Sequence, residues 1–385
     1  MTMLKGIHLT LLIGPGLPVP APKVVVDSLE SVQVNSGIER SGFQLSFKVG
    51  KRSPLITTML PAGYFDPLIT RVVIVATMNG MPHVLSDGVI TRQEMSPSED
   101  PGQSTLTVTG EDLSVLMDVV EMPFMRYPAM PEVAQLYAIL AKYAVFGIIP
   151  IVIPPIFPDI PVPTSRIPTH KGEEEDFHRG TDLAYIKQHA YNSGYIFYVE
   201  PGPAPGGNIA YFGPDIRIPN PQPALNVNMN GHSNVESLSF SLDGMKKKII
   251  VFHIVDPVTK KIAAPIPVPN ISILRPPLGA RPTPPTKVEF SDVGTTLSPG
   301  KAAMRALGTM AAASDAISGS GSLDVLRYGH ILKSRQLVGV RGAGLGYDGL
   351  YYVQSVTHNL KRGEYKQNFS LARDGLISNT PNVIP

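Results

Sequence analysis

Prolines restrict the fold of this sequence more than any other feature, because they are unevenly placed. Of the 39 prolines, seven lie within residues 147–168, and a second concentration spans 265–285. Proline fixes φ and has no N–H donor, so it interrupts helices and central strands. We expect the first stretch to be extended and stiff, in polyproline geometry, and to lie against a protein surface through its apolar residues.

The residues before the first proline stretch have the pattern of a β domain. Residues 43–49 alternate strictly between apolar and polar side chains, as a half-buried strand does. Turn pairs such as Asn79-Gly80 separate further short strands. We therefore predict a meandering antiparallel barrel, closed or nearly closed, over residues 1–112, which strands within about 205–245 complete.

Helices are predicted between this barrel and the middle of the chain. Asp112 can cap a helix that follows it, and a second helix is expected over 131–146. A third helix ends at Gly194, whose freedom suits a left-handed stop, and leads into a β-hairpin. We assign residues 113–200 to a helical and α/β insertion that contains the proline-rich arm 147–168.

The rest of the chain returns to strands. We assign residues 201–300 to β segments that carry the second proline-rich arm, 265–285. Residues 301–385 read as an Ala-rich helix followed by the C-terminal strands of a second barrel. The run Ser-Gly-Ser-Gly-Ser at 318–322 is predicted to be a mobile hinge or loop, because glycine and serine make flexible chains.

The sequence shows few residues in a chemically recognisable pattern. The absence of cysteine excludes disulfides, cysteine-ligated metals and thiol nucleophiles, and a net charge of +2 is too small to indicate nucleic-acid binding. The glycine cluster at 341–349 lacks the spacing of a phosphate-binding loop. His170 and His178 flank an acidic run that could bind a divalent cation, although a solvated loop is favoured. We predict no catalytic, cofactor-binding or metal-binding residues.

Two apolar segments need to be distinguished from export and membrane signals. The N-terminal segment is interrupted by His8 and Thr10 and is followed at once by prolines, unlike a signal peptide. The segment 146–162 contains five prolines, which would break a spanning helix. We expect no signal peptide and no membrane insertion.

Two stretches carry motifs that resemble a known family. Residues 347–376 contain the order D-G-x-Y-x-V-x-x-V-x-H, then a turn and an aromatic-rich strand. Residues 181–215 combine an acidic cap, a helix, a glycine, an aromatic strand and a hairpin that ends in Phe-Gly. Both are similar to the phage late control protein D family, the baseplate hub proteins of contractile tails. The residues for which this resemblance implies a structural role are Gly194, Gly349, Tyr351, His358 and Arg373.

The resemblance implies a mainly β fold with helices (α+β), in which two antiparallel β-barrel tube-like domains carry inserted helices. Three copies would form a ring of pseudo-sixfold symmetry that joins a hexameric inner tube to a trimeric central spike. Expected partners are two further copies in a homotrimer, the inner tube protein, baseplate wedge proteins and a spike. The related valine-glycine repeat proteins continue into a spike, whereas this chain stops at Pro385, so a separate spike polypeptide is expected. Assembly in the cytoplasm, as part of a phage-tail-like particle or virion, follows from the same resemblance.

Within such a ring, the apolar residues of the first proline stretch would serve as an inter-subunit arm, because no helix or strand is predicted to bury them. The arm residues are Ile151, Val152, Ile153, Ile156 and Phe157. Two alternatives to a non-enzymatic hub stay open. One is a tail-tip receptor-binding or carbohydrate-binding protein, in which tyrosines stack on sugars. The other is a tail-associated cell-envelope hydrolase, which would need a carboxylate pair or a metal site.

Overall fold

A computed structural model describes most of the chain. The described residues are 6–38, 41–100, 102–122, 125, 127, 130–156, 180–217, 220–253, 266–267, 275–292, 299–312 and 314–379. The fold is mostly β, with several sheets and a smaller number of helices. Among these residues, no helix combines the length and the apolar character needed to cross a membrane.

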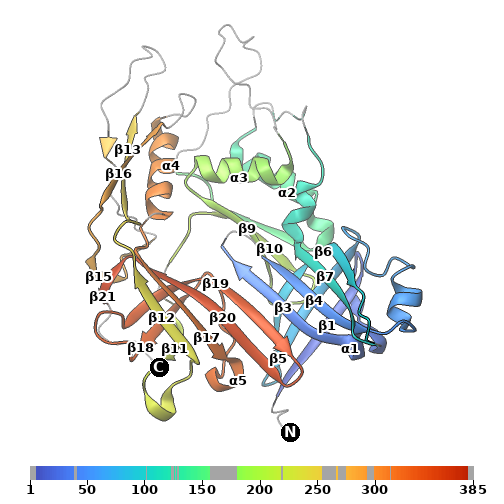
Figure 1. The fold of residues 1–385 in the computed structure, drawn as a ribbon. Helices are drawn as coiled ribbons and strands as arrows, with labels where there is room; N and C mark the ends of the chain where they lie inside the picture. Colours follow the sequence, from blue (N-terminus) through green and yellow to red (C-terminus); the bar gives the residue numbers. More distant parts are fainter. Residues whose placement is uncertain are drawn as a thin grey trace.

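One large sheet runs through both halves of the chain (Figure 1). Its path is β12-β17-β20-β19-β3-β4-β7-β6-β5-β1-β2, and β18 and β11 branch from β19. Neighbouring strands are antiparallel except for the pair β11–β18. The thirteen strands are β1 (Ile7–Pro15), β2 (Val19–Pro20), β3 (Leu29–Gly37), β4 (Gly42–Val49), β5 (Thr70–Met78), β6 (Met81–Ser96), β7 (Ser104–Asp112), β11 (Gln222–Asn226), β12 (Ser237–Leu242), β17 (Ile317–Asp324), β18 (Leu337–Arg341), β19 (Gly349–Lys361) and β20 (Glu364–Arg373).

The alternation seen in the sequence explains how these strands pack. In β4, Phe43, Leu45, Phe47 and Val49 are buried, and the polar residues between them face outward. The N-terminal and C-terminal strands bury one continuous apolar core on the other side of the sheet. They meet where β3 pairs with β19, from Gly37 opposite Ser355 to Ser31 opposite Lys361. The two halves of the chain are therefore one hydrogen-bonded structure.

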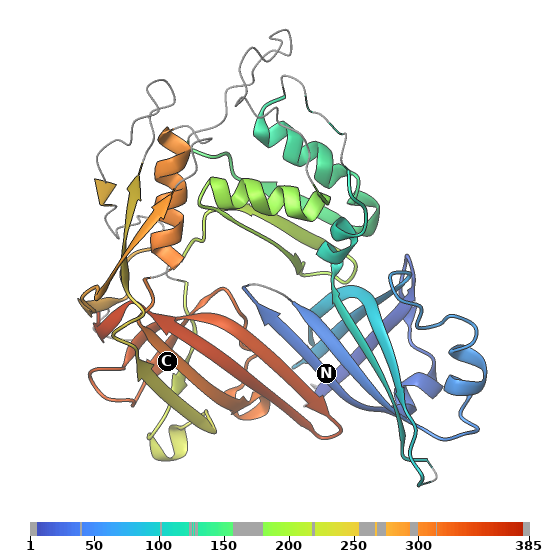
Figure 2. The same cartoon turned by 45° about the horizontal axis from the view of Figure 1, so that its top comes forward.

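The insertion forms a second layer above the large sheet (Figures 1 and 2). A three-stranded sheet in the order β8-β10-β9 packs against two helices, and together they enclose a separate apolar core. Its elements are η2 (Leu113–Asp118), α2 (Glu132–Ala141), η3 (Ala144–Phe146), β8 (Ile148–Val152), α3 (Asp182–Asn192), β9 (Ile196–Pro201) and β10 (Asn208–Gly213).

A buried ion pair ties the insertion to the N-terminal strands. Arg71 of β5 binds Asp87 of β6 through two hydrogen bonds of 2.7 and 2.8 Å. The same carboxylate accepts a 2.9 Å hydrogen bond from Asn208 at the start of β10, and Arg71 also donates to the carbonyl of Gly206. The insertion is thus held on the large sheet by polar as well as apolar contacts.

Small elements complete the described structure. One three-stranded sheet has the order β14-β13-β16, β15 pairs with β21, and α4 lies beside α3 and β13. These elements are β13 (Lys248–His253), β14 (Ile266–Pro267), β15 (Gly279–Pro282), β16 (Lys287–Asp292), β21 (Gly375–Ser378) and α4 (Pro299–Ala312). Short helical turns are α1 (Lys23–Ser28), η1 (Leu55–Met59), η4 (Asn230–His232) and α5 (Val325–Tyr328).

The prediction of a hinge at 318–322 was wrong. These residues lie within β17, which pairs with β12 on one side and β20 on the other. Gly319 and Gly321 leave room for the rings of Phe240 and Phe369, which a Cβ atom would approach to 3.0 and 2.7 Å. The serines face outward. The run contains glycine because neighbouring side chains pack closely against this strand, and not because the segment is flexible.

Two further expectations are corrected by strand pairing. Strands within 205–245 were expected to complete the barrel of residues 1–112, but none of them pairs with its strands. Instead β10 joins the insertion sheet, β11 pairs with β18, and β12 pairs with β17. The first proline stretch contains a strand, because β8 pairs in parallel with β10. Pro150 is tolerated there because β8 is an edge strand, where a missing N–H breaks no ladder. The end of the stretch, from 157 to 168, lies outside the described residues.

Candidate functional site

One side of the large sheet carries small, uncharged polar side chains. Five consecutive strands contribute these side chains, in the order β12, β17, β20, β19 and β3. Side chains of paired residues lie in rows across the strands. One row contains Ser239, Ser320, Ser370 and Ser355, and the next contains Ser237, Ser322, Asn368, Thr357 and Asn35. We call these two rows the polar face.

Hydrogen bonds between neighbours order the polar face. The hydroxyl oxygens of Ser237 and Ser322 are 2.8 Å apart, and those of Ser355 and Ser370 are 2.6 Å apart. Next to these rows, Lys366 of β20 forms a 3.0 Å ion pair with Glu236. The two rows contain no charged and no large apolar side chain, so this surface is suited to contact with water.

Arg335 connects three parts of the structure. Its guanidinium donates to the carbonyl of Gly37 in β3, lies 3.4 Å from the carboxylate of Glu200 in β9, and stacks 4.0 Å from the ring centre of Tyr198. Its φ of 60° is in the left-handed region, which non-glycine residues seldom adopt. Arg335 therefore fixes the insertion against the large sheet at the start of β18.

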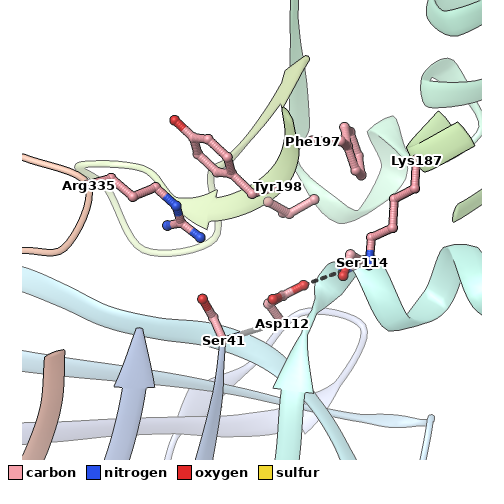
Figure 3. A pocket seen from close by; sticks show the side chains of 8 residues that line it. Ser41, Asp112, Ser114, Lys187, Phe197, Tyr198 and Arg335 are labelled. Carbon is pink, nitrogen blue, oxygen red and sulfur yellow. Dashed lines mark hydrogen bonds between the residues drawn. The ribbon is translucent and has the colours of Figure 1, made fainter. Parts of the chain in front are cut away.

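A small hollow lies beside this junction (Figure 3). Its volume of about 20 Å³ is enough for a single water molecule. Asp112 borders it, and burial raises the pKa of this carboxyl, although hydrogen bonds from Ser114 oppose the shift. Burial likewise raises the pKa of Glu200, against the opposing charge of Arg335. The hollow is too small for a substrate.

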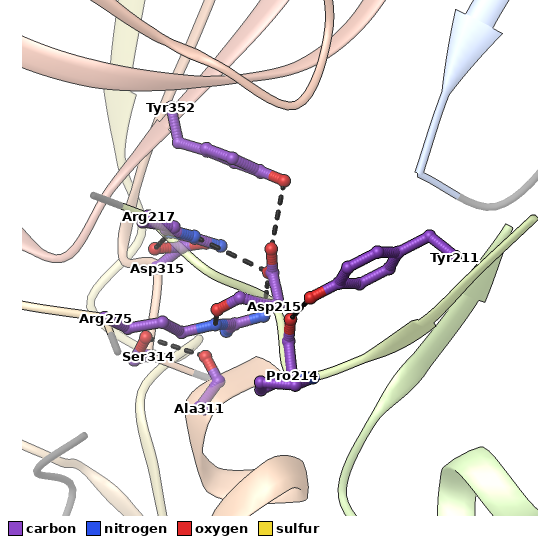
Figure 4. A network of polar contacts seen from close by, with 9 residues as sticks. All are labelled: Tyr211, Pro214, Asp215, Arg217, Arg275, Ala311, Ser314, Asp315 and Tyr352. Atoms are coloured by element: carbon purple, nitrogen blue, oxygen red, sulfur yellow. Dashed lines mark hydrogen bonds and ion pairs between the residues drawn. The ribbon is translucent and has the colours of Figure 1, made fainter. Parts of the chain in front are cut away.

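A second polar cluster contains the buried residues Asp215, Arg217 and Asp315 and the partly buried Arg275 (Figure 4). Arg217 donates two hydrogen bonds of 2.9 Å to Asp315. Asp215 accepts hydrogen bonds from Arg275 and, at 3.1 Å, from the Tyr352 hydroxyl. These residues come from four parts of the chain. Asp215 and Arg217 follow β10, Arg275 lies in the second proline stretch, Asp315 follows α4, and Tyr352 lies in β19.

The charges in this cluster balance, and each is paired. Burial by itself lowers the pKa of Arg217, but Asp315 and Asp215 raise it overall, so the guanidinium stays charged. The Arg217 guanidinium also lies 4.1 Å from the ring centre of Tyr352. Buried charges need such partners, because an unpaired charge in a low dielectric is costly. This arrangement is a structural clamp with no group free to act as an acid, base or nucleophile.

The described residues offer little else for chemistry. A second hollow, next to Arg217, Arg335 and Tyr352, has a volume of about 180 Å³. Sites for small molecules usually enclose about 300 Å³ or more. No group of three or more His, Asp or Glu residues in the described part of the chain is arranged to hold a metal ion. His170, His178 and the acidic run between them lie outside that part.

Three of the motif residues form one structural unit around the glycine cluster at 341–349. Arg373 is fully buried, and its guanidinium donates to two carbonyl oxygens of this loop at 2.7 and 2.8 Å. It also lies 4.4 Å from the ring centre of Tyr351. Gly349 has a φ of 124°, and a Cβ there would lie 2.4 Å from the Ser378 hydroxyl. The glycine cluster is thus a turn whose carbonyl groups Arg373 holds in place.

His358 belongs to a buried hydrogen-bond network. Its Nδ1 lies 2.7 Å from the Tyr365 hydroxyl and 3.2 Å from the amide nitrogen of Gln367. The Gln367 amide also bonds to both the N–H and the carbonyl of Leu332, at 3.0 and 2.9 Å. Burial lowers the pKa of His358 to about 3, so the imidazole is neutral near pH 7. The Gln367 side-chain nitrogen can only donate, which favours the tautomer in which Nδ1 carries no proton.

Gly194 ends α3 in the left-handed conformation, with a φ of 67°. A Cβ at this position would lie 2.2 Å from the carbonyl oxygen of Met304 and 3.3 Å from the Cα of Gly308, both in α4. The residue therefore does more than stop a helix, since it also lets α4 approach α3.

The arm residues have different environments. Ile151 and Ile156 are 43% and 64% exposed, whereas Val152 is buried in the core of the insertion. Ile153 is half-buried and donates its N–H to β10. Phe157 lies outside the described residues. Of the four arm residues that the structure describes, Ile151 and Ile156 present a large exposed apolar surface that a neighbouring subunit could cover.

Arg335, Arg217 and Asp315 were not singled out from the sequence. The partners of these residues are distant along the chain: Arg217 and Asp315 are separated by 98 positions, and Arg335 and Gly37 by 298. The one local sign is the charged pair Asp215 and Arg217 directly after a strand, in a stretch that is otherwise apolar and rich in proline.

Comparison with known proteins identifies the fold. No protein-family model matches the chain, and a search of curated proteins finds no significant match. Among solved structures, the tail protein from Neisseria meningitidis MC58 matches 97% of this chain and 98% of its own, with a TM-score of 0.60 and 13% identity. The 43 kDa tail protein of prophage MuSo2 from Shewanella oneidensis matches 96% of this chain and 100% of its own, with a TM-score of 0.58 and 13% identity.

A chain of the Francisella PdpA–VgrG complex also matches, over 100% of this chain and 55% of its own length, with a TM-score of 0.59 and 10% identity. At sequence identities of 10% to 13%, these matches establish a shared fold but not a shared function. The chain has the fold of phage tail and baseplate-associated proteins over nearly its whole length, and the resemblance drawn from the two motifs is confirmed at that level.

Proposed function

We propose that this chain is a structural, non-enzymatic baseplate hub of a contractile injection system or phage tail, which joins the hexameric inner tube to the trimeric central spike. The observation that carries the proposal is the extent of the structural match. Two tail proteins share the fold over at least 96% of both chains, so the similarity covers the complete architecture and is not limited to one common module.

In this proposal the two halves of the large sheet are the two tube-like domains, and three copies form a pseudo-sixfold ring. The pairing of β3 with β19 supports this role, because it makes the two halves one mechanically continuous sheet. The buried clamps at Arg71, Arg335 and Arg217 hold the insertion and the chain around the second proline stretch on that sheet. A subunit that transmits force between tube and spike needs such fixed connections.

The proposed partners are two further copies, the inner tube protein, baseplate wedge proteins and a separate spike. One structural match is a chain from a complex that contains VgrG, which favours a partner on the spike side. Assembly in the cytoplasm into a phage-tail-like particle or virion belongs to the same proposal. The paired state of the buried charges supports a role without catalysis.

Purification of the full chain, alone and together with candidate tube and spike proteins of the same organism, tests this function. Light scattering should give a mass three times that of one chain, and electron microscopy should show rings with a central channel. The ring should co-purify with both the tube and the spike protein. A stable monomer that binds neither protein would contradict the proposal and would favour the tail-tip binding or hydrolase alternatives.

A further inference from the structure

The larger hollow, of about 180 Å³, has a lining that carries positive charge only. Its polar lining residues are Arg217, Asn220, Arg335, Gln336 and Tyr352, and two apolar residues complete it. Of the residues that the structure describes, no aspartate or glutamate lines this space. The lining therefore offers two guanidinium groups and two side-chain amides as hydrogen-bond donors, and no negative charge. We call this space the arginine hollow.

Both arginines are buried, and each has one N–H group without an acceptor. The side chains of Arg217 and Arg335 are 6% and 8% exposed. The terminal nitrogens of Arg217 donate to Asp315, and those of Arg335 donate to Gly37 and Glu200. Within the described part of the chain, the Nε–H of each arginine has no hydrogen-bond partner. Buried donors are normally satisfied by protein, by water or by a ligand, because an unmade hydrogen bond is costly.

Stacking on tyrosine rings holds both guanidinium groups in place. The Arg217 guanidinium lies 4.1 Å from the ring centre of Tyr352 (Figure 4), and that of Arg335 lies 4.0 Å from the ring centre of Tyr198 (Figure 3). The Nε of Arg217 is 3.7 Å from the Asp215 carboxylate, which is too far for a hydrogen bond. Groups that are already fixed lose little freedom when a ligand binds.

The size of the arginine hollow restricts the class of ligand. Its volume of about 180 Å³ corresponds to about six water molecules of roughly 30 Å³ each. This is less space than most organic ligands need, but it is enough for a phosphate or sulfate ion. Such an oxyanion accepts hydrogen bonds on several oxygens at once, so one ion can satisfy both Nε–H groups. Charge-assisted hydrogen bonds from guanidinium groups to oxyanions are among the stronger ones in proteins.

We propose that the arginine hollow binds one small inorganic oxyanion, of the size of phosphate or sulfate, between Arg217 and Arg335. Arg217 follows β10 of the insertion, and Arg335 precedes β18 of the large sheet. The bound ion therefore links the insertion to the large sheet, in addition to the ion pairs already described. This inference does not depend on the proposed ring, since the site lies within a single chain.

The two amide residues of the lining allow a test that leaves the buried ion pairs intact. Asn220 and Gln336 are exposed, so Asn220→Asp and Gln336→Glu each add a negative charge at nearly constant size. Because like charges repel, each variant should weaken sulfate binding by at least about tenfold. The matched control is Gln93→Glu, the same chemical change at an exposed residue of β6 that does not line the arginine hollow.

Isothermal titration calorimetry of the full chain with sodium sulfate and with sodium phosphate measures the affinity and the number of sites. Sodium chloride keeps the ionic strength constant, and thermal unfolding checks that each variant is folded. The wild type and Gln93→Glu should bind one ion per chain with equal affinity. NMR signals of the arginine Nε–H groups give a direct readout, since sulfate should shift those of Arg217 and Arg335. Arg335→Lys keeps the charge and removes one signal, which assigns it.

Each possible result decides the inference. Binding of one ion per chain that is weakened in Asn220→Asp and Gln336→Glu, and unchanged in Gln93→Glu, supports the site. Equal affinity in all four proteins would mean an adventitious ion only, bound elsewhere, and would overturn it. Binding too weak to measure with both ions would mean that water alone fills the arginine hollow, which also overturns the inference. Neither failure affects the hub proposal, which is tested by the mass of the assembly and by its partners.

Discussion

His358 shows how one buried side chain makes stability depend on pH. The folded protein keeps its imidazole neutral, with a pKa lowered to about 3, because burial disfavours the charged form. In the unfolded chain the same group binds a proton at about pH 6.5. Its contribution to stability is therefore fully present above pH 6.5 and is lost progressively as the pH falls from about 6.5 toward 3.

We predict that this residue accounts for part of the acid sensitivity of the protein. Each pH unit below 6.5 should cost up to about 1.4 kcal/mol, or about 2 kcal/mol between pH 6.5 and pH 5. His358→Gln keeps a neutral hydrogen-bonding group but does not titrate. Urea unfolding at pH 6.5 and at pH 5 measures the free energy of unfolding. Between these pH values it should fall by about 2 kcal/mol less in the variant than in the wild type. Equal losses in both proteins would contradict this origin.

Gly194 allows a second prediction at the residue scale. Gly194→Ala should destabilise the protein by more than the roughly 1–2 kcal/mol that a left-handed backbone costs a non-glycine residue, because its Cβ would meet the carbonyl of Met304. Gly363→Ala is the matched control, since Gly363 has a φ of 79° and no atom within 4 Å of the added Cβ. Thermal unfolding should show a larger loss for Gly194→Ala, and equal losses would exclude the contact with α4.

At the scale of elements, buried ion pairs decide how strands and helices are joined. The pair between Arg217 and Asp315 links the chain after β10 to the chain after α4, and Tyr352 connects both to β19. Breaking one partner of such a pair leaves an uncompensated charge in a low dielectric. Removing both partners leaves an apolar contact of similar volume, which is far less costly.

We predict that Arg217→Met alone destabilises the protein by about 3–5 kcal/mol, and that adding Asp315→Leu restores much of the loss. Chemical unfolding of the wild type, both single variants and the double variant measures this coupling. A double variant as unstable as the sum of the two single variants would show that the pair does not act as a unit.

Strand β8 changes how the proposed arm has to be tested. Deleting residues 150–163 would remove part of a strand that pairs with β10, so it would disturb the insertion itself. We predict instead that Ile151→Ser leaves folding intact but weakens trimer formation, because that side chain is exposed. Val152→Ser should destabilise the insertion, since Val152 is buried in its core. Thermal unfolding and light scattering of both variants distinguish these effects, and an unchanged trimer in Ile151→Ser would exclude the arm.

At the scale of the whole molecule, the large sheet is one cooperative body. Strands separated by more than 300 positions, β3 and β19, pair along seven residues and share one core. The β14-β13-β16 sheet is not hydrogen-bonded to the large sheet within the described residues. Units with few shared contacts open independently of the rest of a protein.

We therefore predict that hydrogen exchange is equally slow in β3 and β19 and faster in β13 and β16. Mass spectrometry of exchanged peptides from the purified chain measures both regions at once. Faster exchange in β3 than in β19 would mean that the two halves unfold separately, which a rigid adaptor between tube and spike could not tolerate.

By itself the sequence determined the local structure of several elements of this protein. The alternation at residues 43–49, the cap at Asp112 and the stop at Gly194 specify their elements through contacts with near neighbours, and the structure contains all three. The two motifs were also enough to predict the resemblance to phage tail and baseplate proteins. Only the tertiary structure decided which strands pair, because a strand's own residues do not encode the identity of its neighbour.

For the same reason, the Ser-Gly run read as a hinge became a strand once β12 and β20 enclosed it, and Pro150 entered a sheet where β8 forms an edge. The contacts of Arg217 with Asp315 and of Arg335 with Gly37 could likewise not be predicted from the sequence. Their partners lie 98 and 298 positions away, and only folding brings such charges close enough to stabilise one another.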